Sequence, residues 1–445
     1  MNKYGFLLAL CVVFSCSEDE YVAIDADLDI QLEEKLLFLS EGKDLSFFIL
    51  PDSDDFSNIP QDPLNPITRE KVVLGQLLFH ETATGGIPKI DEMKGTYSCA
   101  SCHQAKAGFS SGLRQGIGEC GIGFGFKGEG RKRNMDVDRD SIDVQPIRSP
   151  TVLNVAYQDV MLWNGQFGAT GTNVGTEGNW ENIPENLLGL QGVEVQALKG
   201  QKVHRLLIDA AFVQNYQYKS LFDAAFPTVF QGDRYTKKNA ALAIAAYERT
   251  LLANQSPWQA WLKGNKNAMS DREKQGAIVF FDKGKCYQCH TGPALNDKGF
   301  YAFGMGDFDN SEEASILSDV DFEFVKKGRG GFTKNSEDNY KFKTPTLYNT
   351  TDNGFYGHGG TFKTVTEVIR YKMNGKPQNT EVPVENLAPQ FGAIDLTEEE
   401  IENLALFIEN SLQDPNLDRY VPQKIMSGLC FPNNDEPARA DQGCN

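Results

Sequence analysis

Two Cys-x-x-Cys-His pentapeptides, at residues 99–103 and 286–290, constrain this chain more than any other feature. In c-type haem proteins the two thiols of such a motif attach covalently to the porphyrin, and the histidine binds the iron. Nine cysteines and five histidines in 445 residues would give about 0.002 copies by chance. A zinc site would need cysteine and histidine pairs that complete one tetrahedron, and a disulfide leaves the histidines unexplained. The sequence therefore predicts two covalently bound haems. The attachment and iron-binding residues are expected to be Cys99, Cys102, His103, Cys286, Cys289 and His290.

Residues 1–15 have the pattern of an export signal. A positive charge at Lys3 precedes an apolar run over residues 6–14 that is too short to span a bilayer. The string Val13-Phe-Ser-Cys16 is typical of a lipoprotein cleavage site. We expect a signal peptide over residues 1–15 and a lipoprotein anchored through Cys16, in the periplasm or at the cell surface. An ordinary signal peptide cleaved nearby is the alternative.

The charge of the chain bears on its partners. The formal net charge is −18, and the propionates of two haems would add to it. A field of this sign disfavours nucleic acid and favours cationic partners, so a small basic electron-carrier protein is expected. Membrane contact is expected through the lipid anchor only, and a homodimer stays an open alternative.

Helical spacing dominates the rest of the sequence. Apolar residues predict a helix over residues 69–79, with Val72, Val73, Leu77 and Leu78 on one face, and a second helix over 236–252. Capping boxes at Ser270-Asp-Arg-Glu273 and Thr397-Glu-Glu-Glu400 predict helices from 271 to about 281 and over 398–410. Because no strong period-two alternation is present, the fold class is predicted to be all-α.

The order of these helices predicts two cytochrome c-like domains, each with one covalently bound haem, plus long loops. In both halves a helix leads into the haem motif and another helix closes the module, which indicates a diverged duplication. The expected divisions after the signal peptide are a tether and irregular segment over 16–60, haem domains over 61–235 and 236–420, and a C-terminal tail over 421–445.

Three cysteines remain after the haems, the signal and the anchor are counted. Cys430 and Cys444 form a candidate disulfide that would clamp the C-terminal tail, because an exported compartment is oxidising. Cys120 is then left without a partner.

An acidic run in the insert over residues 131–143 hints at calcium. Asp136, Asp138 and Asp140 alternate there, but the glycine and the distal glutamate of an EF-hand loop are absent. A solvated loop is favoured, and calcium stays a doubtful cofactor.

From about Leu64 to Phe407 the chain resembles the bacterial di-haem cytochrome c peroxidases and their MauG-type relatives. The resemblance rests on short strings in a fixed order, none of which would suffice alone. The strings are LGQLLF (74–79), YSCASCH (97–103), SPTVLNVAY (149–157), LWNG (162–165), GVEVQA (192–197), AYERTL (246–251), KCYQCH (285–290), KTPTLYN (343–349) and YGHGGTFKTVTEV (356–368).

The resemblance implies that haem 1, on His103, reacts with peroxide and that haem 2, on His290, relays electrons to it. Glu194 matches the distal acid–base glutamate, and Gln191 or Gln196 would line the same pocket. Trp163 matches a tryptophan that lies between the haems. A carboxylate near the iron can move a peroxide proton if burial tunes its pKa. From spacing alone, Glu194 would instead be a surface glutamate and Trp163 a core residue.

The distal ligand of haem 2 is less certain, so three neighbours compete for it. A methionine ligand raises the potential of a relay haem, which favours Met373. Ungapped alignment with the family puts Lys372 at the ligand position, and MauG-type relatives use a tyrosine, which makes Tyr371 a competitor. Met305 is a poorer candidate, and His358 resembles a family histidine near haem 2.

Around haem 1 the chain departs from the family pattern. Many relatives keep a second histidine in the loop after the first motif, where this chain has Glu119 and Cys120. Haem 1 would then be open at rest, or capped by one of these two residues. His80 and His204 are interpreted as structural.

Hydrogen peroxide reduction to water, with electrons from a small cytochrome c or cupredoxin, is the function that these residues favour. The first alternative is a MauG-like oxidase that acts on a protein or small molecule. The second is a cytochrome that transfers electrons without catalysis.

Overall fold

The computed structural model describes residues 27–40, 42–308 and 322–444. The predicted signal peptide and Cys16 lie outside these residues. Within the described ranges, no helix is both long enough and apolar enough to cross a membrane.

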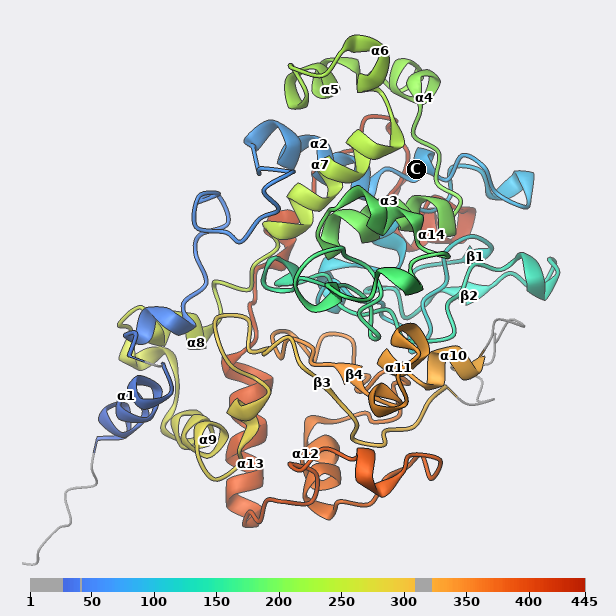
Figure 1. Ribbon diagram of the computed structural model, residues 1–445. Coiled ribbons are helices and arrows are strands. Elements are labelled where there is room, and N and C mark those ends of the chain that lie inside the picture. The colour runs from blue at the N-terminus through green and yellow to red at the C-terminus, as the bar shows by residue number, and fades with distance from the viewer. Residues whose placement is uncertain (1–26, 41, 309–321, 445) are drawn as a thin grey trace, which may run out of the picture.

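The described chain is rich in helices and poor in strands (Figure 1). The helices are α1 (Leu28–Leu39), α2 (Arg69–His80), α3 (Gly192–Val203), α4 (Ala210–Asn215), α5 (Lys219–Ala225), α6 (Gln231–Arg234), α7 (Lys237–Arg249), α8 (Pro257–Leu262), α9 (Asp271–Phe281), α10 (Phe322–Lys326), α11 (Arg329–Thr333), α12 (Val365–Asn374), α13 (Glu398–Leu406) and α14 (Glu436–Gln442). The strands are β1 (Gly121–Ile122), β2 (Lys132–Arg133), β3 (Phe300–Tyr301) and β4 (Phe342–Lys343), paired antiparallel as β1–β2 and β3–β4. The described chain is therefore mostly helical, as expected, and it also contains two short antiparallel strand pairs.

In the upper part of Figure 1, α2 and α3 both pack against α7, and α4, α5 and α6 lie beyond them. The crossing of α2 and α7 depends on Gly75, because a Cβ at that position would overlap the carbonyl oxygen of Ala243. The alanine-rich stretch of α7 leaves room for this close approach.

The lower part repeats this arrangement with α9 and α13. A Cβ at Gly276 of α9 would overlap the carbonyl oxygen of Asn403 in α13. In each half, one helix precedes the haem motif and crosses a second helix that follows the motif. A glycine of the first helix lies at the crossing. This correspondence supports the predicted duplication, and α12 packs against α13.

The predicted helices agree with the structure except in detail. The helix expected over 69–79 is α2, and the capping boxes at Ser270 and Thr397 are both formed. The face predicted for α2 was wrong in part, because Val73 is exposed and Leu74 is buried instead. The helix expected to reach 410 changes at Phe407–Ser411 into a π-helical turn.

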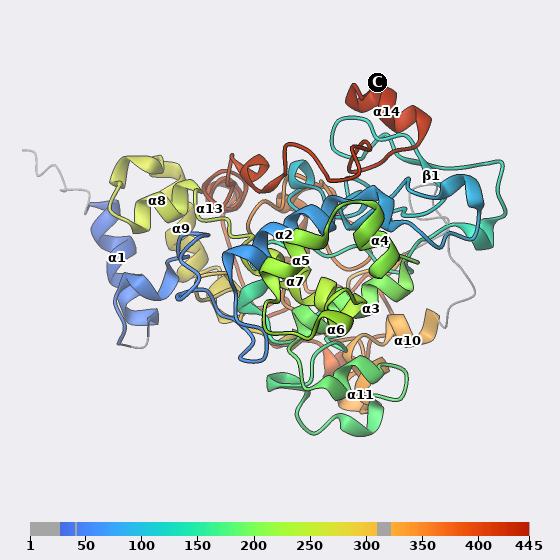
Figure 2. The ribbon, with the colours of Figure 1, turned by 90° about the horizontal axis from the view of Figure 1, so that it is seen from above.

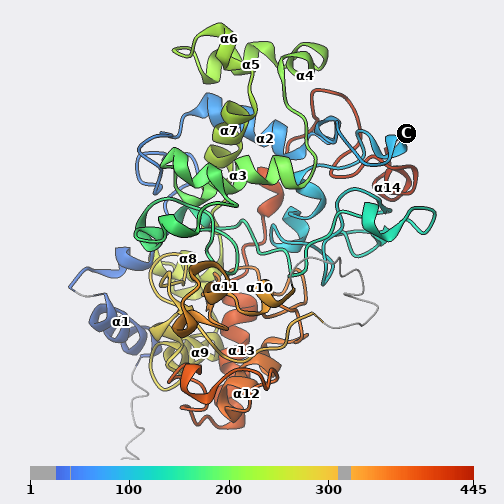
Figure 3. The ribbon, with the colours of Figure 1, turned by 45° about the vertical axis from the view of Figure 1, so that its right-hand side comes forward.

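Each end of the described chain packs against the half of the molecule that holds the haem motif farther from it in the sequence. Helix α1 packs against α9, so it lies with the second motif (Figure 3). The C-terminal tail lies with the first motif, and α14 packs beside β1 (Figure 2). The buried side chains of Arg131 and Asp435 form an ion pair of 3.1 Å in this tail contact. The predicted Cys430–Cys444 disulfide is confirmed.

Helix α7, which was expected to open the second domain, packs on α2 and α3 of the first half.

Candidate haem centres

Each haem motif lies on a short 3₁₀ turn, Cys99–Ser101 or Cys286–Gln288, and its histidine follows directly. The Nδ1 atom of His103 lies 3.2 Å from the carbonyl oxygen of Phe109, and Nδ1 of His290 lies 2.9 Å from that of Leu295. A backbone carbonyl on Nδ1 fixes the ring and leaves Nε2 for a metal. The two motifs are therefore built alike, and we call them the haem 1 site and the haem 2 site.

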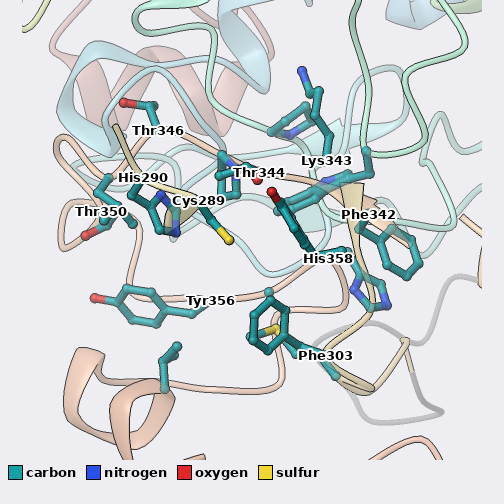
Figure 4. A pocket seen from close by; sticks show the side chains of 18 of the residues that line it. Cys289, His290, Phe303, Phe342, Lys343, Thr344, Thr346, Thr350, Tyr356 and His358 are labelled. Carbon is teal, nitrogen blue, oxygen red and sulfur yellow. The ribbon is translucent and has the colours of Figure 1, made fainter. Parts of the chain in front are cut away.

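The haem 2 site opens on a cavity of about 270 Å³, the volume open to the centre of a water molecule. Figure 4 shows Cys289 and His290 on one side of it and Phe342 and His358 on the other. Much of the wall is apolar, with residues that include Phe280, Leu347, Val365, Val368, Ile369 and Ile408. A flat apolar macrocycle attached to the two cysteines matches this lining.

Two buried cations in this wall test the fit to haem. Arg148 donates to the Asn353 side chain at 2.8 Å and to the Phe355 carbonyl at 2.6 Å, while its Nε atom is buried without a partner. Burial lowers the pKa of Arg148 to about 10 and that of Lys343 to about 7. No described carboxylate forms an ion pair with either side chain. Because buried charges need partners, the carboxylates of haem propionates suit this wall, so the residues present fit the group.

Trp163 lies on the same cavity and is hydrogen-bonded to a second segment that reaches both sites. Its Nε1 atom donates to the carbonyl oxygen of Arg148 at 2.8 Å, and its ring meets that of His358 edge to face at 6.3 Å. Pro150 lines the haem 2 cavity, and its carbonyl also lies close to His103. Residues 148–150 therefore form a short covalent path between the two sites.

Helix α12 presents one face to the haem 2 cavity. Val365, Val368, Ile369 and Lys372 line the cavity from this helix, at helical spacing. The Lys372 amine donates to the Gly284 carbonyl at 3.2 Å, two residues before Cys286. Lys372 therefore reaches the vicinity of the second motif.

The other candidate ligands differ in position. Met373 is half-buried against the apolar core and is not among the residues that line the cavity. The Tyr371 hydroxyl lies 2.8 and 2.7 Å from the carbonyls of Phe303 and Gly304, which occupy it. Met305 does line the cavity, as does His358, whose Nε2 atom is 3.0 Å from Asp307.

Glu194 and Gln191 form one buried cluster with Arg249 of α7. The Glu194 oxygens accept from Arg249 at 2.9 and 2.6 Å, and one of them also accepts from Asn65 at 3.2 Å. The Gln191 oxygen accepts from the same guanidinium at 3.0 Å. Both partners of the ion pair are fully buried. The acid–base role of Glu194 stays a prediction, and these contacts favour a structural role that joins α3 to α7.

Glu119 and Cys120, the candidate caps of haem 1, both have contacts within the protein, and a capping role stays a prediction. Glu119 accepts from the backbone of Lys89 and Ile90 and from the Arg205 side chain. Cys120 is fully buried in a small apolar cluster separate from the main core. Burial raises the pKa of its thiol to about 11, so the thiolate that would bind iron is disfavoured.

Two other features concern metals and histidines. Asp136, Asp138 and Asp140 are exposed, and in the part of the chain that is described no three acidic, cysteine or histidine residues converge on a metal site. His204, which the sequence reasoning treated as structural, lies next to the haem 1 site, with Nδ1 2.8 Å from Asp143. Sequence spacing could not reveal this pair, because the two residues are far apart in the chain.

Comparisons with known proteins agree with this arrangement. Residues 69–267 match the family described as di-haem cytochrome c peroxidase. The cytochrome-c peroxidase IdrP1 of Denitromonas iodatirespirans is 28% identical over 79% of this chain and 83% of its own length. The methylamine utilization protein MauG of Methylophilus methylotrophus is 25% identical over 81% and 89%, and the cytochrome c551 peroxidase of Pseudomonas aeruginosa is 26% identical over 70% and 74%.

Solved structures of two similar proteins agree in fold. A MauG-like protein associated with microbial copper homeostasis covers 83% of this chain and 95% of its own, with 22% identity and a TM-score of 0.58. The di-haem peroxidase BthA from Burkholderia thailandensis covers 81% and 89%, with 16% identity and a TM-score of 0.50. With its paired haem motifs and its repeated helical module, the chain is similar to the di-haem cytochrome c peroxidases and MauG proteins, a family of oxidoreductases whose model matches residues 69–267.

Proposed function

We propose that the protein reduces hydrogen peroxide to water at haem 1, with electrons that enter through haem 2 from a small redox protein. The observation that carries the proposal is the pair of haem motifs with identically oriented histidines, connected through the segment 148–150. Covalently bound haem supplies the redox chemistry at each site. The protein's own residues orient the iron ligands, exclude water from the haem 2 cavity and neutralise buried charge.

Haem 2 is proposed to be the relay because its surroundings are closed and apolar. Its propionates would pair with Arg148 and Lys343, and Trp163 would extend the path toward Pro150 and haem 1. For the second axial position we favour Lys372 over Met373, because α12 turns Lys372 toward the cavity and leaves Met373 off it. Only a neutral amine can bind a metal, so this assignment requires Lys372 to lose its proton on binding.

The electron donor is proposed to be a small basic cytochrome c or cupredoxin. The net charge of −18 would steer a cationic carrier toward the surface and speed its association at low salt. Export and a lipid anchor at Cys16 complete this proposal, since a donor of this kind would be met outside the cytoplasm.

A MauG-like oxidase is the second candidate. It is favoured by the position of Met373 away from the haem 2 cavity, because a haem without methionine ligation has a lower potential. Relatives named MauG match most of the chain. Such an oxidase would hold oxidising equivalents after peroxide and pass them to a substrate instead of accepting electrons from a carrier.

One experiment tests the proposal and separates the candidates. The full-length protein is expressed with haem-attachment machinery, its haem content is measured, and peroxide is added with and without a reduced cytochrome c. The peroxidase proposal expects two haems per chain and steady oxidation of the cytochrome. Two haems with no cytochrome oxidation, and an oxidised state that persists after peroxide, would contradict it in favour of the oxidase.

A further inference from the structure

The negative charge of the chain is gathered near its N-terminal end. Residues 16–60 hold thirteen acidic and two basic residues, a net charge of −11 out of −18 for the whole chain. Helix α1 lies in this segment and packs against α9, the helix that leads into the second haem motif. Figure 2 shows α1 at the outer edge of the molecule, beside α8 and α9. The charge of this segment attracts a cationic protein toward the haem 2 half.

Helix α1 carries an apolar stripe on its outer side as well as on its inner side. Leu32 and Leu36 are fully buried, whereas Ile30, Leu37 and Phe38 are 54%, 48% and 86% exposed. The exposed three are spaced by seven and eight residues, which places them on one side of the helix. Single exposed apolar residues are common on protein surfaces, but three that share a helix face form a patch. We call this surface the outer face of α1.

Acidic side chains share the outer face of α1 with this patch. Glu34 lies one helical turn from both Ile30 and Phe38, and it is exposed. No described residue forms an ion pair or a hydrogen bond with its carboxylate. Asp27, the N-cap residue of the helix, is exposed on the same side. The outer face therefore combines apolar surface with negative charge that the described protein does not neutralise.

A series of aromatic rings connects α1 with the histidine of the haem 2 site. It begins where the Nε1 atom of Trp261 donates to Asp29 of α1 at 2.6 Å. The rings follow one another with centroids 4.8 to 6.5 Å apart, in the order Trp261, Trp258, Phe281, Phe280 and His290. Electrons tunnel more readily through packed groups than across gaps, so a carrier bound at α1 would face a closely packed route to haem 2.

We propose that the outer face of α1 is the docking surface for the small basic electron carrier that supplies haem 2. This inference rests on the proposed function and adds to it the place where the carrier binds. Ile30, Leu37 and Phe38 form the apolar centre of the contact, and Glu34 and Asp27 attract the basic residues around the carrier's own redox centre. In each encounter one electron leaves the reduced carrier and is gained by the iron of haem 2, and no covalent bond forms or breaks.

Two other partners fit the outer face of α1 less well. The anionic head groups of a membrane surface would be repelled by Glu34 and by the acidic segment around it. A second copy of the chain would bring the same carboxylates together, because a two-fold interface pairs one surface with itself. A partner with positive charge around an apolar centre gains from both kinds of residue on this face.

Binding of a basic mitochondrial cytochrome c tests the docking surface without turnover of peroxide. The full-length holoprotein is titrated with the oxidised cytochrome, and stopped-flow spectroscopy follows the reduction of haem 2 by the reduced cytochrome. We expect Glu34→Lys to slow association about tenfold at low salt and less at high salt, because salt screens the attraction. We expect Phe38→Ser to weaken binding about tenfold, mainly through faster dissociation.

Matched variants separate docking from effects on the whole molecule. Glu181→Lys makes the same change in net charge at an exposed position elsewhere, and Phe230→Ser removes a phenylalanine that is 77% exposed at the start of α6. Both should bind the cytochrome as the wild-type protein does. A small uncharged hydroquinone should reduce haem 2 at the same rate in every variant, because it needs no docking surface.

Wild-type binding in both Glu34→Lys and Phe38→Ser would overturn the proposal, and so would equal losses in the two matched variants. A dimer that Phe38→Ser dissociates would assign the outer face to a second copy instead. Binding of the unlipidated Cys16→Ser form to phosphatidylglycerol vesicles, lost in Phe38→Ser, would assign it to a membrane. Tighter cytochrome binding after removal of residues 17–26 would assign it to that segment. Failure of the peroxidase function is a separate result, because the cytochrome would then dock and reduce haem 2 while peroxide is left intact.

Discussion

The two haem sites each have a histidine–aspartate pair beside them, and the pairs use opposite sides of the imidazole. In the haem 1 half, Asp143 binds Nδ1 of His204, and 38% of the His204 side chain is accessible. At haem 2, Asp307 binds Nε2 of His358, and the ring stacks on Phe342 with centroids 3.7 Å apart. The first ring is held through one nitrogen, whereas the second is held on both its edge and its face. The same residue pair is therefore more rigidly fixed at the haem 2 site than in the haem 1 half.

Buried positive charge also differs between the two halves. In the haem 1 half, Arg131 and Arg249 are paired with Asp435 and Glu194. In the wall of the haem 2 cavity, Arg148 and Lys343 form no ion pair with a described carboxylate, although the charge of Asp159 acts on Lys343. Haem propionates would supply the missing negative charge there, whereas Arg131 and Arg249 are balanced by the protein itself.

The largest effect is expected from Glu194→Gln, which tests whether Glu194 has a structural role as the counter-charge of Arg249. The change leaves Arg249 buried without its counter-charge, and we expect it to lower the free energy of unfolding by about 3 kcal/mol. Urea unfolding measures this loss. Cyanide binding at haem 1 should keep its wild-type rate in the folded variant.

A matched control is Glu402→Gln, which removes an exposed partner of Arg272 and should change stability little. An unchanged unfolding curve for Glu194→Gln, together with loss of cyanide binding, would return the acid–base role to Glu194.

Lys372→Met tests what makes haem 2 different from haem 1. Thioether ligation raises the potential of haem, so we expect a rise on the order of 0.1 V, within the roughly 0.8 V that axial ligands span. Spectroelectrochemistry measures the shift, and the near-infrared band of methionine-ligated ferric haem should appear only in the variant. Met373→Leu is the control, and a change of the haem 2 spectrum in that control would mean that Met373 is the ligand after all.

Asp143→Asn is expected to have a smaller effect, a loss of about 1 kcal/mol in stability, because it weakens the hydrogen bond that holds His204. Burial lowers the pKa of His204, but the charge and hydrogen bond of Asp143 outweigh burial, and the pKa is raised overall; Arg205 opposes the rise. The basic form of His204 is therefore lost as the pH falls through a value above its ordinary one.

The pH dependence of stability gives the sign of this effect. Because the pKa of His204 is raised in the folded protein, the pair stabilises the fold at low pH, and this stabilisation is lost as the pH rises through the raised pKa. Without Asp143, burial and the charge of Arg205 both oppose protonation of His204. The loss of stability in Asp143→Asn should thus be larger at acidic than at alkaline pH, and an equal loss at both would contradict this coupling.

Trp163→Phe should have the smallest effect on the folded protein. It removes one hydrogen bond to the Arg148 carbonyl, for which we expect a loss of about 1 kcal/mol in stability. It should also slow the return of haem 1 to its resting spectrum when electrons are supplied through haem 2. Equal rates in the two proteins would remove Trp163 from the path between the sites.

The sequence predicted the features that depend on local patterns. Haem motifs, capping boxes and apolar spacing are short-range signals, so the two sites, α2, α9 and the start of α13 were all recognised. The Cys430–Cys444 disulfide followed from the oxidising compartment and the count of cysteines. None of these inferences required knowledge of how distant segments meet.

Features that depend on the direction of a helix face were less predictable. One residue along a helix turns the side chain by about 100°, so a string match cannot decide between Lys372 and Met373. The same limit applies to α3, where Glu194 faces α7 and His204, at the end of the helix, lies near His103. The contact of α1 with α9 joins segments far apart in the chain and leaves no local signal.

Cyanide titration of the oxidised full-length protein, followed by electron paramagnetic resonance, tests most directly whether one haem is open and the other closed. The account predicts two ferric haem signals, of which the one from haem 1 converts fully to a cyanide complex while that of haem 2 is unchanged. Conversion of both signals, or of neither, would contradict the division of roles between the two sites.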